Sequence, residues 1–105
     1  MAVVEPAQCP DVTVLRGNSW AQPITLPATD SGGNPLTWGT FTVTCAQTSL
    51  ITVNHSGTPP TVVLSLTGAQ TAAITDRWIH WYVAEDTVMA GNEFLTGRVK
   101  LVDPQ

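Results

Sequence analysis

Apolar and polar residues alternate one by one along much of this chain. In residues 41–45 the odd positions are Phe, Val and Cys, and both even positions are Thr. A period of two places one set of side chains on the buried face of a β-strand and the other set toward solvent. The same alternation predicts strands at 11–15, 20–26, 61–66 and 95–101, and a short strand at 50–53.

The segment 77–85 predicts another strand, with large side chains on both of its faces. Alternate residues form these faces, Ile79, Trp81 and Val83 on one and Trp78, His80 and Tyr82 on the other. Because Trp81 shares its face with aliphatic residues, its ring is assigned to the core. The stripe of Trp78, His80 and Tyr82 then covers the outer face.

Turn-forming residues cluster between the predicted strands, at 30–35, 54–60 and 90–92. Thr67 is a suitable helix N-cap and helix-forming residues follow it, which predicts one helical turn at 67–74. Pro23 cannot donate a ladder hydrogen bond, so its strand is expected at a sheet edge or a bulge. Strands at this spacing predict an all-β antiparallel β-sandwich of about seven strands.

A chain of 105 residues is expected to form one domain with one core. We divide it into an N-terminal arm at 1–10, a β-sandwich domain at 11–102 and a C-terminal tail at 103–105. The arm is long enough to lie along a neighbouring protein. The expected core comprises Phe41, Val43, Val62, Leu64, Trp81 and Val99.

Charged residues make up only 11% of the chain, and the net charge is −4. The four cations, Arg16, Arg77, Arg98 and Lys100, form no basic stripe in the sequence, so nucleic-acid binding is not expected. No apolar run approaches the ~18 to 20 residues of a membrane span, and the first residues lack the features of a signal peptide. The chain is therefore expected to be soluble, without a membrane partner, and made in the cytoplasm.

Candidate catalytic and metal-binding residues are few. His55 lies in a Gly- and Pro-rich segment and is expected to be a solvated turn residue. Asp76, Glu85, Asp86 and Glu93 offer oxygen ligands for Ca²⁺, but they lack the close alternating spacing of a calcium loop, which favours a solvated hairpin end at 85–86. A hydrolase would need an acid and a base in one cleft, and no such pair can be named. We therefore expect no enzyme activity, cofactor or metal.

Other polar residues have local explanations. Asp30 and Asp76 precede turns, where a carboxylate accepts hydrogen bonds from nearby backbone N–H groups. Arg16 is expected to pair with a nearby acid. Cys9 and Cys45 form neither a disulfide framework nor a zinc motif, and the sequence leaves a single bridge between them open. We favour a free Cys45 thiol on the core-facing side of its strand.

Five large aromatic rings, four Trp and one Tyr, exceed the two or three that one sandwich core holds. At least one ring should therefore lie outside the core. Three interpretations of the Trp78, His80 and Tyr82 stripe stay open, and we favour contact with another protein. The others are a stacking platform for a sugar, formed by Trp78 and Tyr82, and cover by the arm or a loop.

Short motifs point to a family. They are Arg16-Gly17-Asn18-Ser19-Trp20, the turn at 30–37 (Asp-Ser-Gly-Gly-Asn-Pro-Leu-Thr), Leu64-Ser65-Leu66-Thr67 and a closing strand with Gly97 inside it. Over roughly 12–102 the chain resembles small immunoglobulin-like domains of tailed-phage structural proteins, typified by the N-terminal domain of baseplate upper proteins and also found in head fibres. The resemblance implies an immunoglobulin-like form of the predicted sandwich.

The resemblance also implies a function. Domains of this family serve as attachment or oligomerisation modules, so we expect a non-enzymatic bacteriophage virion protein, made in the host bacterial cytoplasm. Its expected partners are other virion proteins of the capsid, tail or baseplate, together with self-association on the particle. Because the chain ends after the sandwich, a capsid decoration or cement role, or an adaptor role at the tail, baseplate or fibre, is favoured over host recognition. The alternative is a carbohydrate-binding module.

Overall fold

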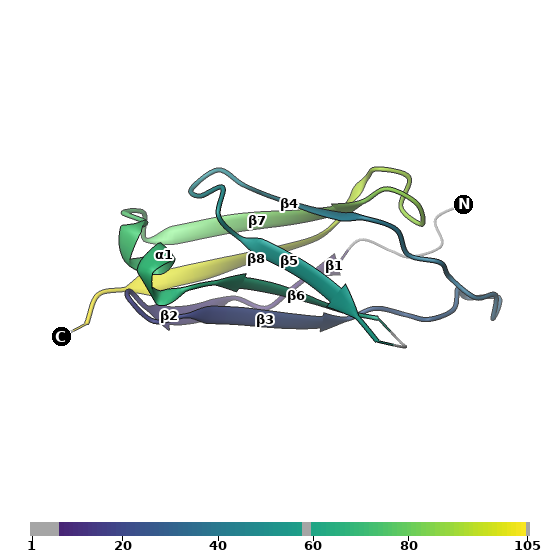
Figure 1. Ribbon diagram of the computed structural model, residues 1–105, viewed down its shortest axis with the longest axis horizontal. Coiled ribbons are helices and arrows are strands. Elements are labelled where there is room, and N and C mark those ends of the chain that lie inside the picture. The colour runs from purple at the N-terminus through teal and green to yellow at the C-terminus, as the bar shows by residue number, and fades with distance from the viewer. Residues whose placement is uncertain (1–6, 58–59, 105) are drawn as a thin grey trace.

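The computed structural model describes residues 7–57 and 60–104, which form two β-sheets packed as a sandwich with one short helix (Figure 1). The predicted all-β sandwich is confirmed. The elements in chain order are β1 (Ala7–Gln8), β2 (Val12–Leu15), β3 (Trp20–Thr25), β4 (Phe41–Cys45), β5 (Thr52–Ser56), β6 (Thr61–Leu66), α1 (Gly68–Ala73), β7 (Trp78–Glu85) and β8 (Glu93–Val102).

The larger sheet has the order β1-β8-β7-β4, with β2 also paired to β8, and the smaller sheet has the order β3-β6-β5. β7 pairs antiparallel with β4 and β8, but β1 and β2 both run parallel to β8. The expectation of a purely antiparallel sandwich is therefore wrong at this edge. Alternation along one strand shows which side chains are buried, but it carries no information on the direction of a neighbouring strand.

Two predicted boundaries also differ from the structure. The short strand expected at 50–53 is β5, which begins later and pairs with β6 through Ser56, so His55 lies in a strand. In the expected arm, Ala7 and Gln8 pair with β8, and the Cys9 amide donates to the Thr96 carbonyl oxygen at 2.8 Å. Residues 7–9 thus belong to the sheet, whereas 1–6 lie outside the described residues.

Side chains from the inner faces of both sheets form the core. Five of the six expected core residues are buried, namely Phe41, Val62, Leu64, Trp81 and Val99. Val43 is only partly buried and packs against the core margin. It lies on β4, the last strand of its sheet, where fewer neighbours cover an inward side chain.

Trp81 is the largest fully buried side chain. It lies directly opposite Gly97 in the β7–β8 register. A Cβ atom at Gly97 would lie 2.3 Å from Cζ2 and 2.6 Å from Cε2 of the indole. Only glycine at position 97 therefore leaves room for the Trp81 ring against β8.

The predicted helical turn is confirmed as α1. Thr67 is its N-cap and forms a capping box with Gln70. The Gln70 amide donates to the Thr67 hydroxyl at 3.2 Å, and the Thr67 amide donates to Gln70 Oε1 at 2.8 Å. These bonds satisfy backbone donors that a helix start leaves unpaired.

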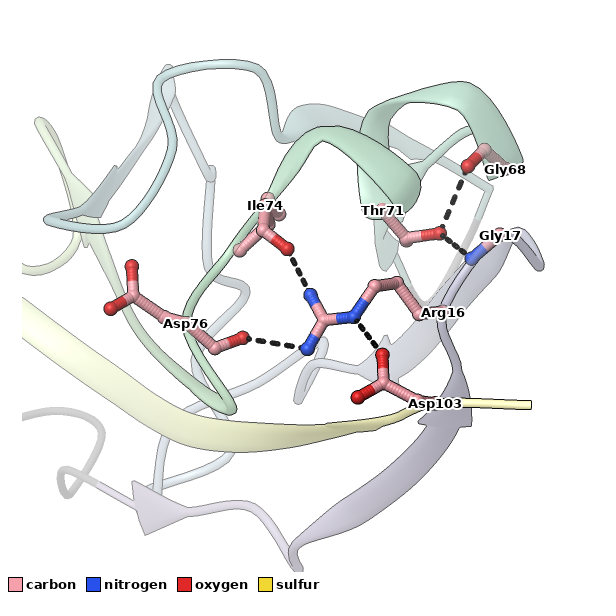
Figure 2. A network of polar contacts seen from close by, with 7 residues as sticks. All are labelled: Arg16, Gly17, Gly68, Thr71, Ile74, Asp76 and Asp103. Carbon is pink, nitrogen blue, oxygen red and sulfur yellow. Dashed lines mark hydrogen bonds and ion pairs between the residues drawn. The ribbon is translucent and has the colours of Figure 1, made fainter. Parts of the chain in front are cut away.

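The Arg16-Gly17-Asn18 motif attaches the β2–β3 turn to α1 (Figure 2). The fully buried Thr71 hydroxyl accepts a hydrogen bond from the Gly17 amide at 3.0 Å. The same hydroxyl can donate to the carbonyl oxygens of Asn18 at 2.8 Å and Gly68 at 3.0 Å. A Cβ atom at Gly68 would lie 2.4 Å from the Gly17 carbonyl oxygen, so the two backbones approach as closely as glycine allows.

Arg16 extends this contact to the C-terminal segment (Figure 2). Its Nε donates to Asp103 Oδ1 at 2.7 Å, and its terminal nitrogens donate to the carbonyl oxygens of Ile74 and Asp76. The expected pairing of Arg16 with an acid is confirmed. At Asp76 the backbone carbonyl oxygen, and not the side-chain carboxylate, accepts the hydrogen bond from Arg16.

We predict that Gly97→Ala destabilises the fold, because the added methyl group overlaps the buried Trp81 ring. Overpacking of this kind costs about 1 to 3 kcal/mol or more, which thermal or urea unfolding would measure. Gly32→Ala is the control, since a Cβ atom there meets nothing nearer than Asn34 Nδ2 at 3.3 Å. Equal melting temperatures for both variants would contradict the packing described for Trp81.

We predict that Thr71→Val, which keeps the side-chain shape but removes the hydroxyl, lowers the free energy of unfolding by about 1 to 3 kcal/mol. The Gly17 amide would lose its acceptor. Thr44→Val, at an exposed position of β4, is the matched control and should have little effect. A Thr71 variant as stable as the control would show that the buried hydroxyl contributes nothing to the attachment of α1.

Candidate protein-contact surface

The outer face of β7 carries the three predicted contact residues. Trp78, His80 and Tyr82 alternate with the buried Ile79, Trp81 and Val83, so the predicted assignment of the two faces is confirmed. Tyr82 is 40% exposed, His80 is exposed and Trp78 is half-buried. Their side chains thus lie along one sheet surface, with β4 on one side of β7 and β8 on the other.

Cations from β8 lie against the Trp78 ring. The Arg98 guanidinium carbon is 4.5 Å from the ring centroid, and Lys100 Nζ is 5.8 Å from it. Such contacts are attractive because the face of the indole carries negative charge density. Trp78 therefore presents a ring already covered by charge, unlike the bare platform on which a sugar would stack.

Asp11 holds Arg98 in this position. Arg98 Nε donates to Asp11 Oδ1 at 3.1 Å, and a second guanidinium nitrogen donates to Oδ2. These hydrogen bonds lower the pKa of Asp11 below its ordinary value of 3.8. Asp11 immediately precedes β2 and Arg98 lies on β8, so the pair also joins the segment before β2 to β8.

A shallow hollow of about 330 Å³ lies beside Tyr82 on this face. Its walls come from β1, β7 and β8 and include Tyr82, Glu93 and Thr96. Sequence reasoning missed the β8 residues of the surface. The signal was present, because Thr96, Arg98 and Lys100 alternate with the buried Leu95, Val99 and Leu101.

A separate aromatic cluster closes one end of the sandwich. Trp38 stacks on Phe41 and Phe94, with centroids 5.8 and 5.5 Å apart, and its Nε1 donates to the Pro27 carbonyl oxygen at 3.0 Å. His55 meets Phe41 edge-on at 4.9 Å and remains exposed, so the expected solvated side chain is confirmed, but its placement in a turn is wrong because His55 lies in β5. Contact between β4 and β5 brings Phe41 and His55 together.

The expectation of a solvated end at 85–86 is wrong for Glu85, whose side chain is fully buried. Its carboxylate accepts hydrogen bonds from the amides of Gly39 at 2.6 Å and Met89 at 2.7 Å. The neighbouring Asp86 accepts one from the Thr40 amide at 2.8 Å. Both acids therefore attach the loop before β4 to the turn after β7.

The remaining candidate ligands are dispersed. Asp76 precedes β7, at the opposite end of that strand from Glu85. Within 7–57 and 60–104, no three His, Cys, Asp or Glu residues come close enough to share a metal ion. Cys9 and Cys45 are both free thiols of intermediate burial, and burial raises the pKa of Cys9.

Comparisons with known proteins do not assign the chain to a family. No protein-family model matches it, and no curated protein or solved structure does. In the part of the chain that the structure describes, no helix has the length and apolar character needed to cross a membrane. Function is therefore inferred from the surface itself and from the sequence motifs.

We predict that Asp11→Asn reduces the acid sensitivity of the fold. A folded-state pKa below 3.8 gives stability that is complete above 3.8 and is lost as the pH falls through the lower folded value. The melting temperature should therefore fall less steeply below pH 3.8 in the variant than in the wild type. Asp30 and Asp86, whose pKa values are lowered by hydrogen bonds from the amides of Asn34 and Thr40, titrate in both proteins. If the melting temperatures of the two proteins fall equally below pH 3.8, the Asp11–Arg98 pair does not lower the pKa of Asp11.

Proposed function

We propose that this protein is a non-enzymatic structural component of a tailed-phage particle. It would act as a capsid decoration or cement protein, or as an attachment module of the tail, baseplate or fibre. In this proposal the host bacterium makes the protein in its cytoplasm, and no cofactor takes part. The virion assignment is supported by the sequence motifs that resemble phage immunoglobulin-like domains.

The topology supports that resemblance. The sheet order β3-β6-β5 corresponds to the B-E-D order of immunoglobulin domains, and β4-β7-β8 corresponds to C-F-G. The first strand differs from the constant-type arrangement, because β2 joins β8 and leaves the sheet that contains β3. Sandwiches host many functions, so the topology alone does not identify the role.

The observation that carries the contact function is the composition of the outer β7–β8 face. Two rings, Trp78 and Tyr82, lie on a face that also carries Arg98, flanked on β4 by the exposed Thr42 and Thr44. Protein interfaces are enriched in aromatic residues and Arg, and a few such residues dominate the binding energy. This surface therefore suits contact with another virion protein.

A carbohydrate-binding module is the second candidate. The exposed Tyr82 ring and the hollow beside it favour this candidate. The cover of Trp78 by Arg98 disfavours a platform made of both rings. A glycan array separates the two candidates, since only a carbohydrate-binding module should retain a sugar there.

We predict that Trp78→Ala together with Tyr82→Ala leaves the domain folded but lowers its copy number on purified particles. Each truncated hot-spot ring costs on the order of 2 kcal/mol of binding energy. The matched control is Thr25→Ala together with Thr52→Ala, at exposed positions of the other sheet. A folded double variant that attaches at full copy number would place the contact elsewhere, and loss of its melting transition would place both rings in the core.

A further inference from the structure

Charge changes sign along the outer face of β7 and β8. On β8, Lys100 lies opposite Trp78 and Arg98 lies opposite His80. Glu93 begins the same strand and lies opposite Ala84 at the other end of β7. Asp11 balances the charge of Arg98, so Lys100 makes one end of the strand pair positive and Glu93 makes the other end negative.

An irregularity in the ladder places Glu93 on this outer face. Leu95 pairs with Val83 and Glu93 pairs with Ala84, so Phe94 is the extra residue and is buried. Glu93 is exposed and, together with Tyr82, lines the hollow of about 330 Å³. The negative charge thus lies beside the exposed ring.

The charges at the two ends lack partners within the described chain. The ion pairs found among residues 7–57 and 60–104 are Arg16–Asp103 and Arg98–Asp11. Lys100 and Glu93 belong to neither pair. Both are available to a partner whose charges have the complementary order.

We propose that this face binds a second copy of the same chain, with the two β7–β8 surfaces packed face to face in opposite directions around a two-fold axis. Lys100 of each copy would then meet Glu93 of the other. Tyr82 and its opposite residue Thr96 lie between these charges on the strand pair, so the Tyr82 rings of the two copies would meet near the axis. This inference rests on the proposed role of the face as a protein contact, and names a partner for it.

Symmetry is the reason to choose a second copy. A two-fold contact brings the same patch of both subunits together, so the patch must be complementary to itself when reversed. A strand pair that is positive at one end and negative at the other meets that condition. In the two-fold arrangement the Lys100–Glu93 contact occurs twice. A single charge change therefore alters two contacts in the dimer.

The area of the face indicates a weak dimer. The sheet is four strands wide in the order β1-β8-β7-β4, and β7 has 8 residues. At ~4.8 Å between strands and ~3.3 Å per residue, the flat area is on the order of 500 Å² per copy. Stable specific interfaces bury about 800 Å² per partner, so we expect a dimer that forms with rising concentration.

Charge exchange tests the arrangement. Lys100→Glu and Glu93→Lys should each weaken dimerisation on the order of tenfold or more, because each places like charges opposite one another at both ends. Mixing the two single variants should give a heterodimer, since every contact between them then joins opposite charges. The double variant, Lys100→Glu with Glu93→Lys, should dimerise as the wild type does. Sedimentation equilibrium over a concentration series measures all four proteins.

Controls separate specific contact from net charge and from folding. Thr52→Glu together with Asn54→Asp changes the net charge as Lys100→Glu does, but on exposed positions of the other sheet, and should dimerise normally. Melting curves establish that each variant is folded. A monomeric wild type, or single variants that do not associate when mixed, would overturn the dimer.

The dimer and the proposed function can fail separately. If the wild type is monomeric while the Trp78→Ala, Tyr82→Ala variant is lost from particles, that result leaves the contact function in place with a different partner. If the wild type dimerises but the Trp78→Ala, Tyr82→Ala variant attaches to particles at full copy number, the self-contact is retained. The role of this face in attachment to the virion is then removed.

Discussion

The contact between Trp81 and Gly97 determines how the rest of the molecule is arranged. The buried indole fills the space above a glycine on the neighbouring strand, and any larger residue would overlap it. Trp81 Nε1 has no hydrogen-bond partner among the described residues, so packing and not polar bonding holds the ring. Because side chains alternate strictly, this one contact also turns Trp78, His80 and Tyr82 outward.

Polar contacts to backbone groups complete the two ends of the sandwich. At one end, Thr71 and Arg16 join the β2–β3 turn, α1 and the residues after β8. At the other, Glu85 and Asp86 hold the loop that precedes β4. A buried carboxylate is costly unless hydrogen bonds satisfy it, and two backbone amides do so for Glu85. These groups are therefore engaged in structure, and the outer β7–β8 face retains the side chains available for contact.

That face combines a low overall charge with a local order of charges. Arg98 and Lys100 cover Trp78 at one end, and Glu93 lies beside Tyr82 at the other. In protein interfaces a few aromatic residues supply most of the binding energy, whereas rim charges select the partner and its orientation. The surface thus contains both elements that specific protein recognition requires.

The local sequence pattern was sufficient to predict the β-sandwich class and the capped helix at Thr67. It also predicted the inward position of Trp81 and the outward position of Trp78, His80 and Tyr82. Each of these depends on residues a few positions apart. The parallel pairing of β2 with β8, the burial of Glu85, the contact of His55 with Phe41 and the partial exposure of Val43 depend on segments far apart in the chain. Alternation specifies the side of a strand but neither its neighbour nor its direction, so only the assembled sheets decided these features.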